Sequence, residues 1–122
     1  MPKILIVDDE KEAVDMLARR FTKQNYEVET AYSGERAVEK VKESRPHIML
    51  LDIQMPGMDG LEALKQAKEA DPSLGVIMVT GEPDEDIAKD AMHLGAHDFV
   101  IKPIDFNYLN LAVTTKIIDM VG

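Results

Sequence analysis

The sequence contains no cysteine and no tryptophan among its 122 residues. The absence of cysteine excludes disulfide frameworks, thiolate zinc sites and cysteine nucleophiles. Tracts rich in Gln, Ser or Pro are also missing, while 45% of the residues are hydrophobic. This proportion is enough to build one core, so we expect a single folded domain over residues 1–122.

Basic residues are scarce relative to acidic ones. The chain has 14 Lys and Arg against 23 Asp and Glu, for a net charge of -9. Such a charge repels a polyphosphate backbone, so we expect no direct nucleic-acid binding by this segment. Long apolar runs are lacking too: residues 4–7 are too short for a signal peptide or a membrane span. We therefore expect no membrane association and a cytoplasmic location.

Five short apolar runs alternate with five segments of helical periodicity. The runs predict strands over residues 3–7, 28–31, 47–51, 75–79 and 98–101. The periodic segments predict helices over residues 10–24, from Ser33 onwards, from Leu61 until Asp71–Pro72, around Ile87–Met92 with Gly95 as the stop, and over 105–120.

This strict alternation of strand and helix predicts an α/β fold, namely a single doubly wound domain with a parallel sheet covered by helices on both faces. In open sheets of this type, reactive groups gather at the carboxyl ends of the strands. Function is therefore expected where the apolar runs end.

Polar side chains directly follow four of the five predicted strands: Asp8 and Asp9, Asp52, Thr80, and Lys102. Each has an ordinary structural explanation when taken alone. Asp9 suits a helix cap, Asp52 suits a turn, Thr80 can simply end a strand, and a lone lysine is usually solvated. All four explanations would have to hold at the same edge of one sheet, so a shared site is the better interpretation.

The charges of these side chains suggest a metal. Two carboxylates about 5 Å apart repel by roughly 3 kcal/mol at an effective dielectric constant near 20. Three carboxylates and one ammonium group should therefore bind a cation, and oxygen ligands on an open face favour Mg²⁺. A carboxylate beside Mg²⁺, a lysine and a hydroxyl suits the formation and hydrolysis of an acyl phosphate.

Four segments carry a family resemblance: ILIVDDE at residues 4–10, LDIQMPGMDG at 51–60, VTG at 79–81 and GAHDFVIKP at 95–103. In this order and at these spacings, residues 3–120 resemble the CheY-like receiver domains of response regulators in two-component systems. The resemblance implies a flavodoxin-like (βα)₅ fold whose parallel strands have the order 2-1-3-4-5.

The resemblance also implies the roles of the acidic residues. Asp52 would be the phosphoacceptor. Asp9 and Asp52 would ligate Mg²⁺ together with the backbone carbonyl of Gln54, and Asp8 would act mainly through a metal-bound water.

The same resemblance assigns the remaining positions. Lys102 would pair with the phosphoryl group, placed by a cis peptide bond between Lys102 and Pro103. Thr80 would be the switch hydroxyl, and Phe99 the switch aromatic. Gln54 and Glu82, two residues beyond Asp52 and Thr80, would tune the lifetime of the acyl phosphate.

A receiver of this kind is a signalling switch and not an enzyme with a separate substrate. It would take a phosphoryl group from a sensor histidine kinase, a phosphotransfer protein or a small phosphodonor. The output would be a partner domain or protein, or a homodimer through the fourth helix, fifth strand and fifth helix. Leu111 and Ile118 are surplus to core packing and indicate such a surface, with Ile87 or Ala91 as candidates beside them. The alternative is that they are scattered surface hydrophobes.

Competing interpretations are weaker. A phosphatase of the haloacid dehalogenase type would need a DxDx[TV] pattern after the first strand, where this chain has Asp8-Asp9-Glu10. A degenerate, binding-only receiver is disfavoured because all five site positions carry competent residues. His93 and His97 have the spacing of a helical zinc pair, but Gly95 lies between them. The GxxG motif at residues 57–60 lacks the basic surroundings of a nucleic-acid clamp. Whether the domain stands alone or belongs to a longer regulator stays open.

Overall fold

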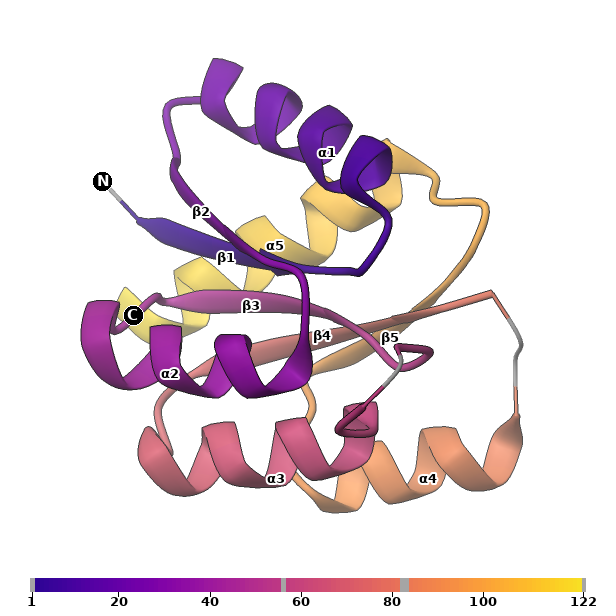
Figure 1. Ribbon diagram of the computed structural model, residues 1–122. Coiled ribbons are helices and arrows are strands. Elements are labelled where there is room, and N and C mark those ends of the chain that lie inside the picture. Colours follow the sequence, from indigo (N-terminus) through magenta and orange to yellow (C-terminus); the bar gives the residue numbers. More distant parts are fainter. Residues whose placement is uncertain (1, 56, 82–83, 122) are drawn as a thin grey trace.

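The structure, a computed structural model, describes residues 2–55, 57–81 and 84–121. Within these ranges strands and helices alternate strictly along the chain (Figure 1). Their bounds are β1 Lys3–Val7, α1 Lys11–Lys23, β2 Glu27–Ala31, α2 Gly34–Ser44, β3 Ile48–Asp52, α3 Gly60–Ala70, β4 Gly75–Thr80, α4 Glu85–His93, β5 Asp98–Ile101 and α5 Phe106–Val121.

The strands form one parallel sheet in the order β2-β1-β3-β4-β5, which confirms the predicted topology. The inner strands β3 and β4 are buried along their whole length, as their continuous apolar sequences predict. The edge strand β2 reads EVETA and is only partly buried, which explains its weaker sequence signal. The order places β1, β3, β4 and β5 side by side, so their carboxyl ends meet.

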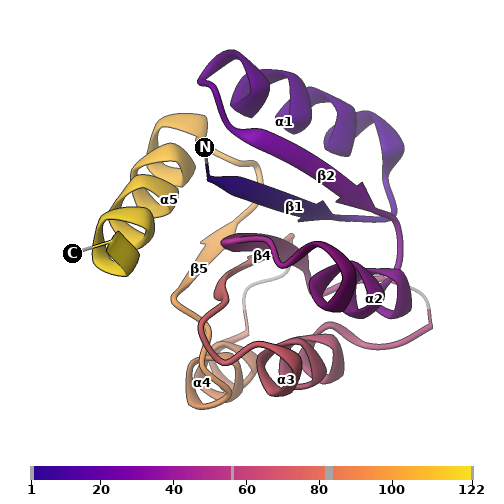
Figure 2. The same ribbon diagram turned by 90° about the vertical axis from the view of Figure 1, so that its left-hand side faces the viewer.

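Helices cover both faces of the sheet: α1 and α5 lie on one face, and α2, α3 and α4 lie on the other (Figures 1 and 2). Alternate residues of β3 supply the two resulting cores. Ile48 and Leu50 pack with α1 and α5, while Met49 and Leu51 pack with the other three helices. Complete burial of such a side chain contributes roughly 1.5–3 kcal/mol, so the middle of the sheet supplies much of the stability.

Most predicted helix ends are confirmed to within a residue or two. The Ser33 hydroxyl accepts a hydrogen bond from the backbone N–H of Arg36 at 3.1 Å, and α3 ends before Asp71. Gly95 follows α4 with a φ of 101°, a left-handed conformation that suits glycine. Asp9, however, does not cap α1, because the cap position is Glu10, whose side chain makes no capping bond.

Three other sequence expectations concern positions near the periphery. His93 ends α4, whereas His97 lies in the loop before β5, so the pair does not share a helix. Ala91 is fully buried, so it is wrong as a candidate surface residue, whereas Ile87 is half-buried. Pro56 and Glu82 lie outside the described residues. In the described part of the chain, no helix has the length and apolarity needed to span a bilayer.

Candidate functional site

Four strands deliver the predicted site residues to the carboxyl edge of the sheet. Asp8 follows β1, Asp52 ends β3, Thr80 ends β4, and Lys102 follows β5. The first three are almost completely buried, with exposed fractions of 6%, 3% and 1%. Buried polar side chains are uncommon in a sheet core, and here the neighbouring strands bring all of them to one place.

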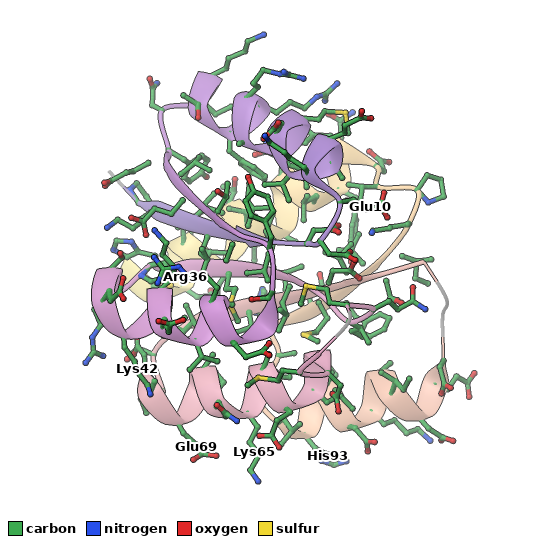
Figure 3. All side chains as sticks on the ribbon, in the orientation of Figure 1. Glu10, Arg36, Lys42, Lys65, Glu69 and His93 are labelled. Carbon is green, nitrogen blue, oxygen red and sulfur yellow. The ribbon has the colours of Figure 1, made fainter. Side chains whose placement is uncertain are left out.

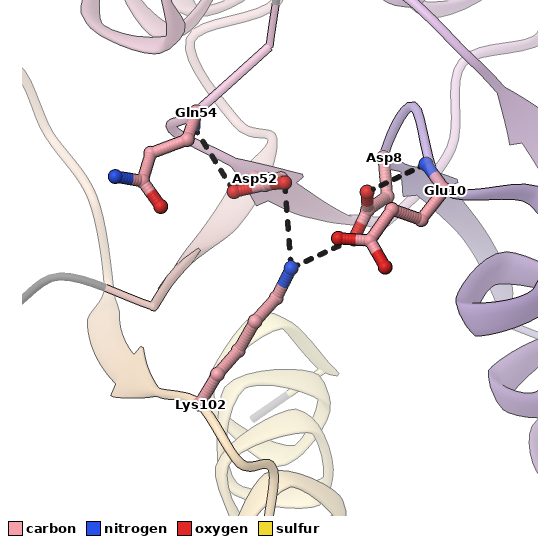
Figure 4. Close-up of polar contacts among 5 residues, drawn as sticks. All are labelled: Asp8, Glu10, Asp52, Gln54 and Lys102. Carbon is pink, nitrogen blue, oxygen red and sulfur yellow. Dashed lines mark hydrogen bonds and ion pairs between the residues drawn. The ribbon is translucent and has the colours of Figure 1, made fainter.

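Lys102 bridges the two buried carboxylates (Figure 4). Its Nζ lies 3.1 Å from Oδ2 of Asp8 and 3.4 Å from Oδ2 of Asp52. The side chain of Lys102 is 26% exposed, so the lysine is only partly buried, in contrast to the two carboxylates. The lysine therefore neutralises part of the negative charge of this edge. The peptide bond between Lys102 and the following Pro103 is cis, as the resemblance implied.

Backbone groups hold the second oxygen of each carboxylate. The N–H of Glu10 donates to Oδ1 of Asp8 at 2.9 Å, and the N–H of Gln54 donates to Oδ1 of Asp52 at 3.0 Å (Figure 4). In both cases the donor lies two residues after the aspartate, which is the arrangement of an Asx turn. Glu10 was not a predicted site residue. The turn after each strand was the only signal that could have identified it.

The pKa of Asp52 is raised above its ordinary value of 3.8. Burial is the largest cause, and the negative charge of Asp8 adds to it; the Gln54 N–H and Lys102 act in the opposite direction without cancelling them. Burial alone would lower the pKa of Lys102, but its hydrogen bond to Asp8 and the charges of Asp52 and Asp8 outweigh burial and raise that pKa. The cluster therefore keeps a surplus of negative charge that its own lysine does not remove.

Asp8, Asp9 and Asp52 together fit a divalent cation. Each offers one carboxylate oxygen, and these oxygens lie within 4.8 Å of one another. Asp9 is exposed, in contrast to the other two. An oxygen-only donor set with surplus negative charge matches the preference of Mg²⁺ and excludes a soft-metal site. The Gln54 side chain is exposed beside this cluster, and an added Cβ at Gly81 would lie 3.6 Å from its Oε1.

Thr80 and Phe99 lie on the opposite side of Asp52 from the acidic pair. Thr80 pairs in register with Ile101, so it stands next to β5. Phe99 is half-buried and packs against the core under α3 and α4. Phe99 and Ile101 also line an open cavity of about 340 Å³ beside the start of α4. Thr80 therefore borders the acidic cluster, and Phe99 borders the surface formed by α4 and β5.

Comparisons with known proteins identify the family to which this chain is similar. The family model described as "Response regulator receiver domain" matches residues 4–114. The regulatory protein AtoC of Escherichia coli K12 is 40% identical over 91% of this chain but only 24% of its own length. Sporulation initiation phosphotransferase F of Bacillus subtilis is 38% identical over 91% of this chain and 90% of its own length.

A solved structure adds detail to these sequence matches. The crystal structure of the CheX–CheY–BeF3–Mg²⁺ complex from Borrelia burgdorferi matches with a TM-score of 0.89 and 36% identity. The match covers 93% of this chain and 87% of that one. The chain thus spans nearly all of two of these relatives and about a quarter of AtoC.

Proposed function

Because the chain belongs to the response regulator receiver domains, which are phosphoacceptor signalling switches, we propose that its phosphoacceptor is Asp52. The observation that carries this assignment is the position of Asp52 in the sheet. It ends the central strand β3, between β1, which leads to Asp8, and β4, which ends in Thr80, and its Oδ2 lies 3.4 Å from Nζ of Lys102. Asp9 is exposed and Asp8 is paired with Lys102 at the shorter distance, so neither is surrounded in this way.

In the proposed reaction an oxygen of Asp52 attacks the phosphorus atom of a phosphodonor. A new O–P bond forms while the P–N bond of a phosphohistidine, or the P–O bond of a small donor such as acetyl phosphate, breaks. The leaving group keeps the electron pair of the broken bond. Lys102 pairs with a phosphoryl oxygen, and the Thr80 hydroxyl donates to another.

Asp8, Asp9 and Asp52 are the residues that would hold Mg²⁺, with the Gln54 carbonyl as the further ligand implied by the resemblance. When bound, Mg²⁺ supplies positive charge to the phosphoryl oxygens. The complex of the Borrelia CheY with BeF3 and Mg²⁺ supports this choice of ion. The phosphorylated state ends by hydrolysis. Water attacks the phosphorus atom, phosphate is released, and the carboxylate of Asp52 is restored. Gln54 and Glu82 are proposed to tune this hydrolysis.

The proposed signal runs from Thr80 to Phe99. A phosphoryl dianion on Asp52 is a strong hydrogen-bond acceptor, so the Thr80 hydroxyl moves towards it. The space that Thr80 leaves lets Phe99 turn inward, and the surface of α4, β5 and α5 changes shape. A partner that binds only the inward state then favours phosphorylation by linkage.

The proposed context follows from this role. Residues 1–122 form one receiver domain that acts in the cytoplasm, takes its phosphoryl group from a histidine kinase or phosphotransfer protein, and catalyses no reaction on a separate substrate. Its output is a partner domain or protein, or a homodimer through α4, β5 and α5. Neither nucleic acid nor membrane is a direct ligand of this segment.

Intact-mass spectrometry after incubation with Mg²⁺ and acetyl phosphate tests the central assignment. Wild-type protein should gain one phosphoryl group, and Asp52→Asn should gain none. Asp90→Asn is the matched control, because Asp90 is an exposed carboxylate on α4 that does not belong to the acidic cluster of Asp8, Asp9 and Asp52. Labelling of Asp52→Asn to the wild-type level would refute the assignment.

A further inference from the structure

The exposed side chains of α2 and α3 are all charged. Figure 3 shows three of them, Lys42, Lys65 and Glu69, extending away from the fold. Glu35, in the first turn of α2, is exposed as well, but its carboxylate lies against the loop between β3 and α3. Of this loop, here named the β3–α3 loop, the structure describes residues 53–55 and 57–59. An exposed acid with a defined partner on the loop that follows Asp52 therefore needs an explanation beyond surface charge.

Glu35 contacts the second half of the β3–α3 loop. The backbone N–H of Met58 donates to Oε1 of Glu35 at 3.4 Å, a long hydrogen bond that the negative charge of the acceptor strengthens. Gly57 has a left-handed φ of 88°, and an added Cβ there would lie 3.3 Å from Oε2 of Glu35. An added Cβ at Gly34 would lie 3.2 Å from the Cβ of Met58, so the start of α2 fits closely against the loop (Figures 1 and 2). Two neighbouring residues of α2 thus hold Gly57 and Met58 in place.

The ends of the β3–α3 loop are fixed by other elements. The N–H of Ile53 donates to the carbonyl of Val79 on β4 at 3.1 Å. An added Cβ at Gly60 would lie 2.6 Å from the Cα of Ile53, so the two ends of the loop lie against each other. Asp59 caps α3 by accepting a hydrogen bond from the N–H of Leu61 at 2.7 Å. The middle of the loop, in contrast, is held by a side chain from α2.

The first half of the same loop carries Gln54, whose backbone N–H donates to Oδ1 of Asp52 at 3.0 Å. Gly57 follows Gln54 by three positions, a connection of at most about 11 Å. Because both ends of the loop are fixed, freedom gained in its middle is taken up by the few peptide groups between them, and those on either side of Gln54 are among these. The carbonyl of Gln54 is also the Mg²⁺ ligand that the family resemblance implies. The hold on Met58 therefore affects both backbone groups of Gln54.

We propose that Glu35 is a positioning residue of the phosphoryl-transfer site: its carboxylate holds the β3–α3 loop, and the loop holds the backbone of Gln54 against Asp52. Glu35 acts through the loop, because it does not belong to the acidic cluster of Asp8, Asp9 and Asp52. This role in the reaction rests on the proposed function. The hold on the loop in unphosphorylated protein does not.

Charge offers a rival explanation for Glu35. An acidic residue in the first turn stabilises a helix through its macrodipole, and a negative charge near the site attracts a cation whatever the position of the loop. Two substitutions separate the reach of the side chain from its charge. Glu35→Gln keeps the length and an acceptor oxygen but removes the charge, whereas Glu35→Asp keeps the charge but shortens the side chain by one methylene group. If Glu35 positions the loop, Gln replaces it and Asp does not.

Amide hydrogen exchange of Gln54, followed by NMR on unphosphorylated protein without metal, measures the hold on the loop. Glu35→Ala and Glu35→Asp should each speed this exchange about threefold to tenfold, the change expected for loss of one hydrogen bond. Glu35→Gln should exchange as wild type does. Glu39→Ala is the matched control, because Glu39 is an exposed acid one turn further along α2 whose carboxylate pairs with Arg36 at 3.6 Å. Circular dichroism checks that the variants are folded, and unchanged Gln54 exchange in Glu35→Ala would overturn the proposal.

Two further measurements connect the loop to the reaction: Mg²⁺ affinity by titration calorimetry, and the rate of phosphorylation by acetyl phosphate from intact mass. Both should fall in Glu35→Ala and Glu35→Asp and stay near wild type in Glu35→Gln and Glu39→Ala. Equal impairment of Glu35→Ala and Glu35→Gln, with normal values for Glu35→Asp, would assign the effect to charge and refute the positioning role. A wild type that gains no phosphoryl group would instead refute the proposed function, and the exchange rates would still decide whether Glu35 holds the loop.

Discussion

Leu50 and Asp52 lie two residues apart on β3 and are almost equally buried, with exposed fractions of 2% and 3%. Their energetic consequences are opposite. Leu50 packs among the side chains of α1 and α5, where burial is favourable. Asp52 is a carboxylate whose burial is costly, and the Gln54 N–H and Lys102 offset that cost only in part, since its pKa stays raised. The middle of the sheet therefore stabilises the folded state. The buried carboxylate at its carboxyl edge lowers the stability of that state.

This contrast shows how a small domain keeps a reactive site. The apolar strands hold Asp8, Asp52, Thr80 and Lys102 together, although the three carboxylates at this edge repel one another. The surplus charge is what an incoming cation and phosphoryl group would relieve. Sites of this kind bury like charges beside one another, and such departures from the rules of core packing are expected at functional positions.

The largest expected effect on stability lies in the middle of the sheet. Leu50→Ala should lower the free energy of unfolding by about 2–5 kcal/mol, through lost burial and a residual cavity. Denaturant titration measures this, with metal-free Asp52→Asn as the comparison. Asp52→Asn should be as stable as wild type or more so. A larger loss for Asp52→Asn than for Leu50→Ala would reverse the comparison.

The next effect concerns signalling from the edge. Thr80→Ala should still accept phosphate at Asp52 but lose the change in partner affinity or self-association, a coupling of about 1–3 kcal/mol. The reason is that the methyl side chain cannot donate to the phosphoryl group. Intact-mass spectrometry measures phosphorylation of the variant, and sedimentation velocity measures its self-association. A variant that is phosphorylated and switches as wild type does would exclude the Thr80 route.

Metal affinity should separate the two adjacent acids. Asp9 is proposed as a direct ligand, while Asp8 is already paired with Lys102, so Asp9→Asn should weaken Mg²⁺ binding about tenfold more than Asp8→Asn. Titration calorimetry on the two variants compares a buried with an exposed carboxylate at the same edge. A greater loss for Asp8→Asn would contradict the assigned roles.

The raised pKa of Asp52 predicts a smaller dependence of stability on pH. A folded-state pKa above the unfolded value means that the folded protein binds the proton more tightly. In metal-free protein, the stability of wild type relative to Asp52→Asn should therefore rise as the pH falls through the folded pKa towards 3.8, and stay constant below it. Denaturant melts across this range measure the difference. If the stability of wild type relative to Asp52→Asn instead fell on acidification, the folded protein would favour the ionised form of Asp52.

The smallest expected effect lies at Tyr108 on α5. The pKa of Tyr108 is raised, mainly by its hydrogen bond to Asp98 and also by that carboxylate's charge. Asp98→Asn should return this pKa towards the ordinary value of 10.0. The ultraviolet absorbance of tyrosinate reports it, because the chain has three tyrosines and no tryptophan. Asp90→Asn should leave the titration unchanged.

Much of the fold and part of the site could be predicted from residues alone. Buried parallel strands read as continuous apolar runs, so β1, β3 and β4 were evident, and Asp52 and Lys102 stood visibly at strand ends. The strand order was available only through the family resemblance. The helix N-cap at Ser33 was predictable because capping depends on neighbouring residues. Asp9 is of a residue type that often caps helices, but the cap position of α1 is Glu10.

What the sequence by itself determined was the alternation of strand and helix and the presence of acids, a hydroxyl and a lysine directly after four strands. Both depend on neighbouring residues, because periodicity and turns are local properties. Only the tertiary structure decided that Lys102 bridges Asp8 and Asp52, and that the backbone N–H groups of Glu10 and Gln54 supply the second hydrogen bonds. Lys102 lies 94 residues from Asp8 along the chain, and a contact of that kind exists only after the sheet has assembled.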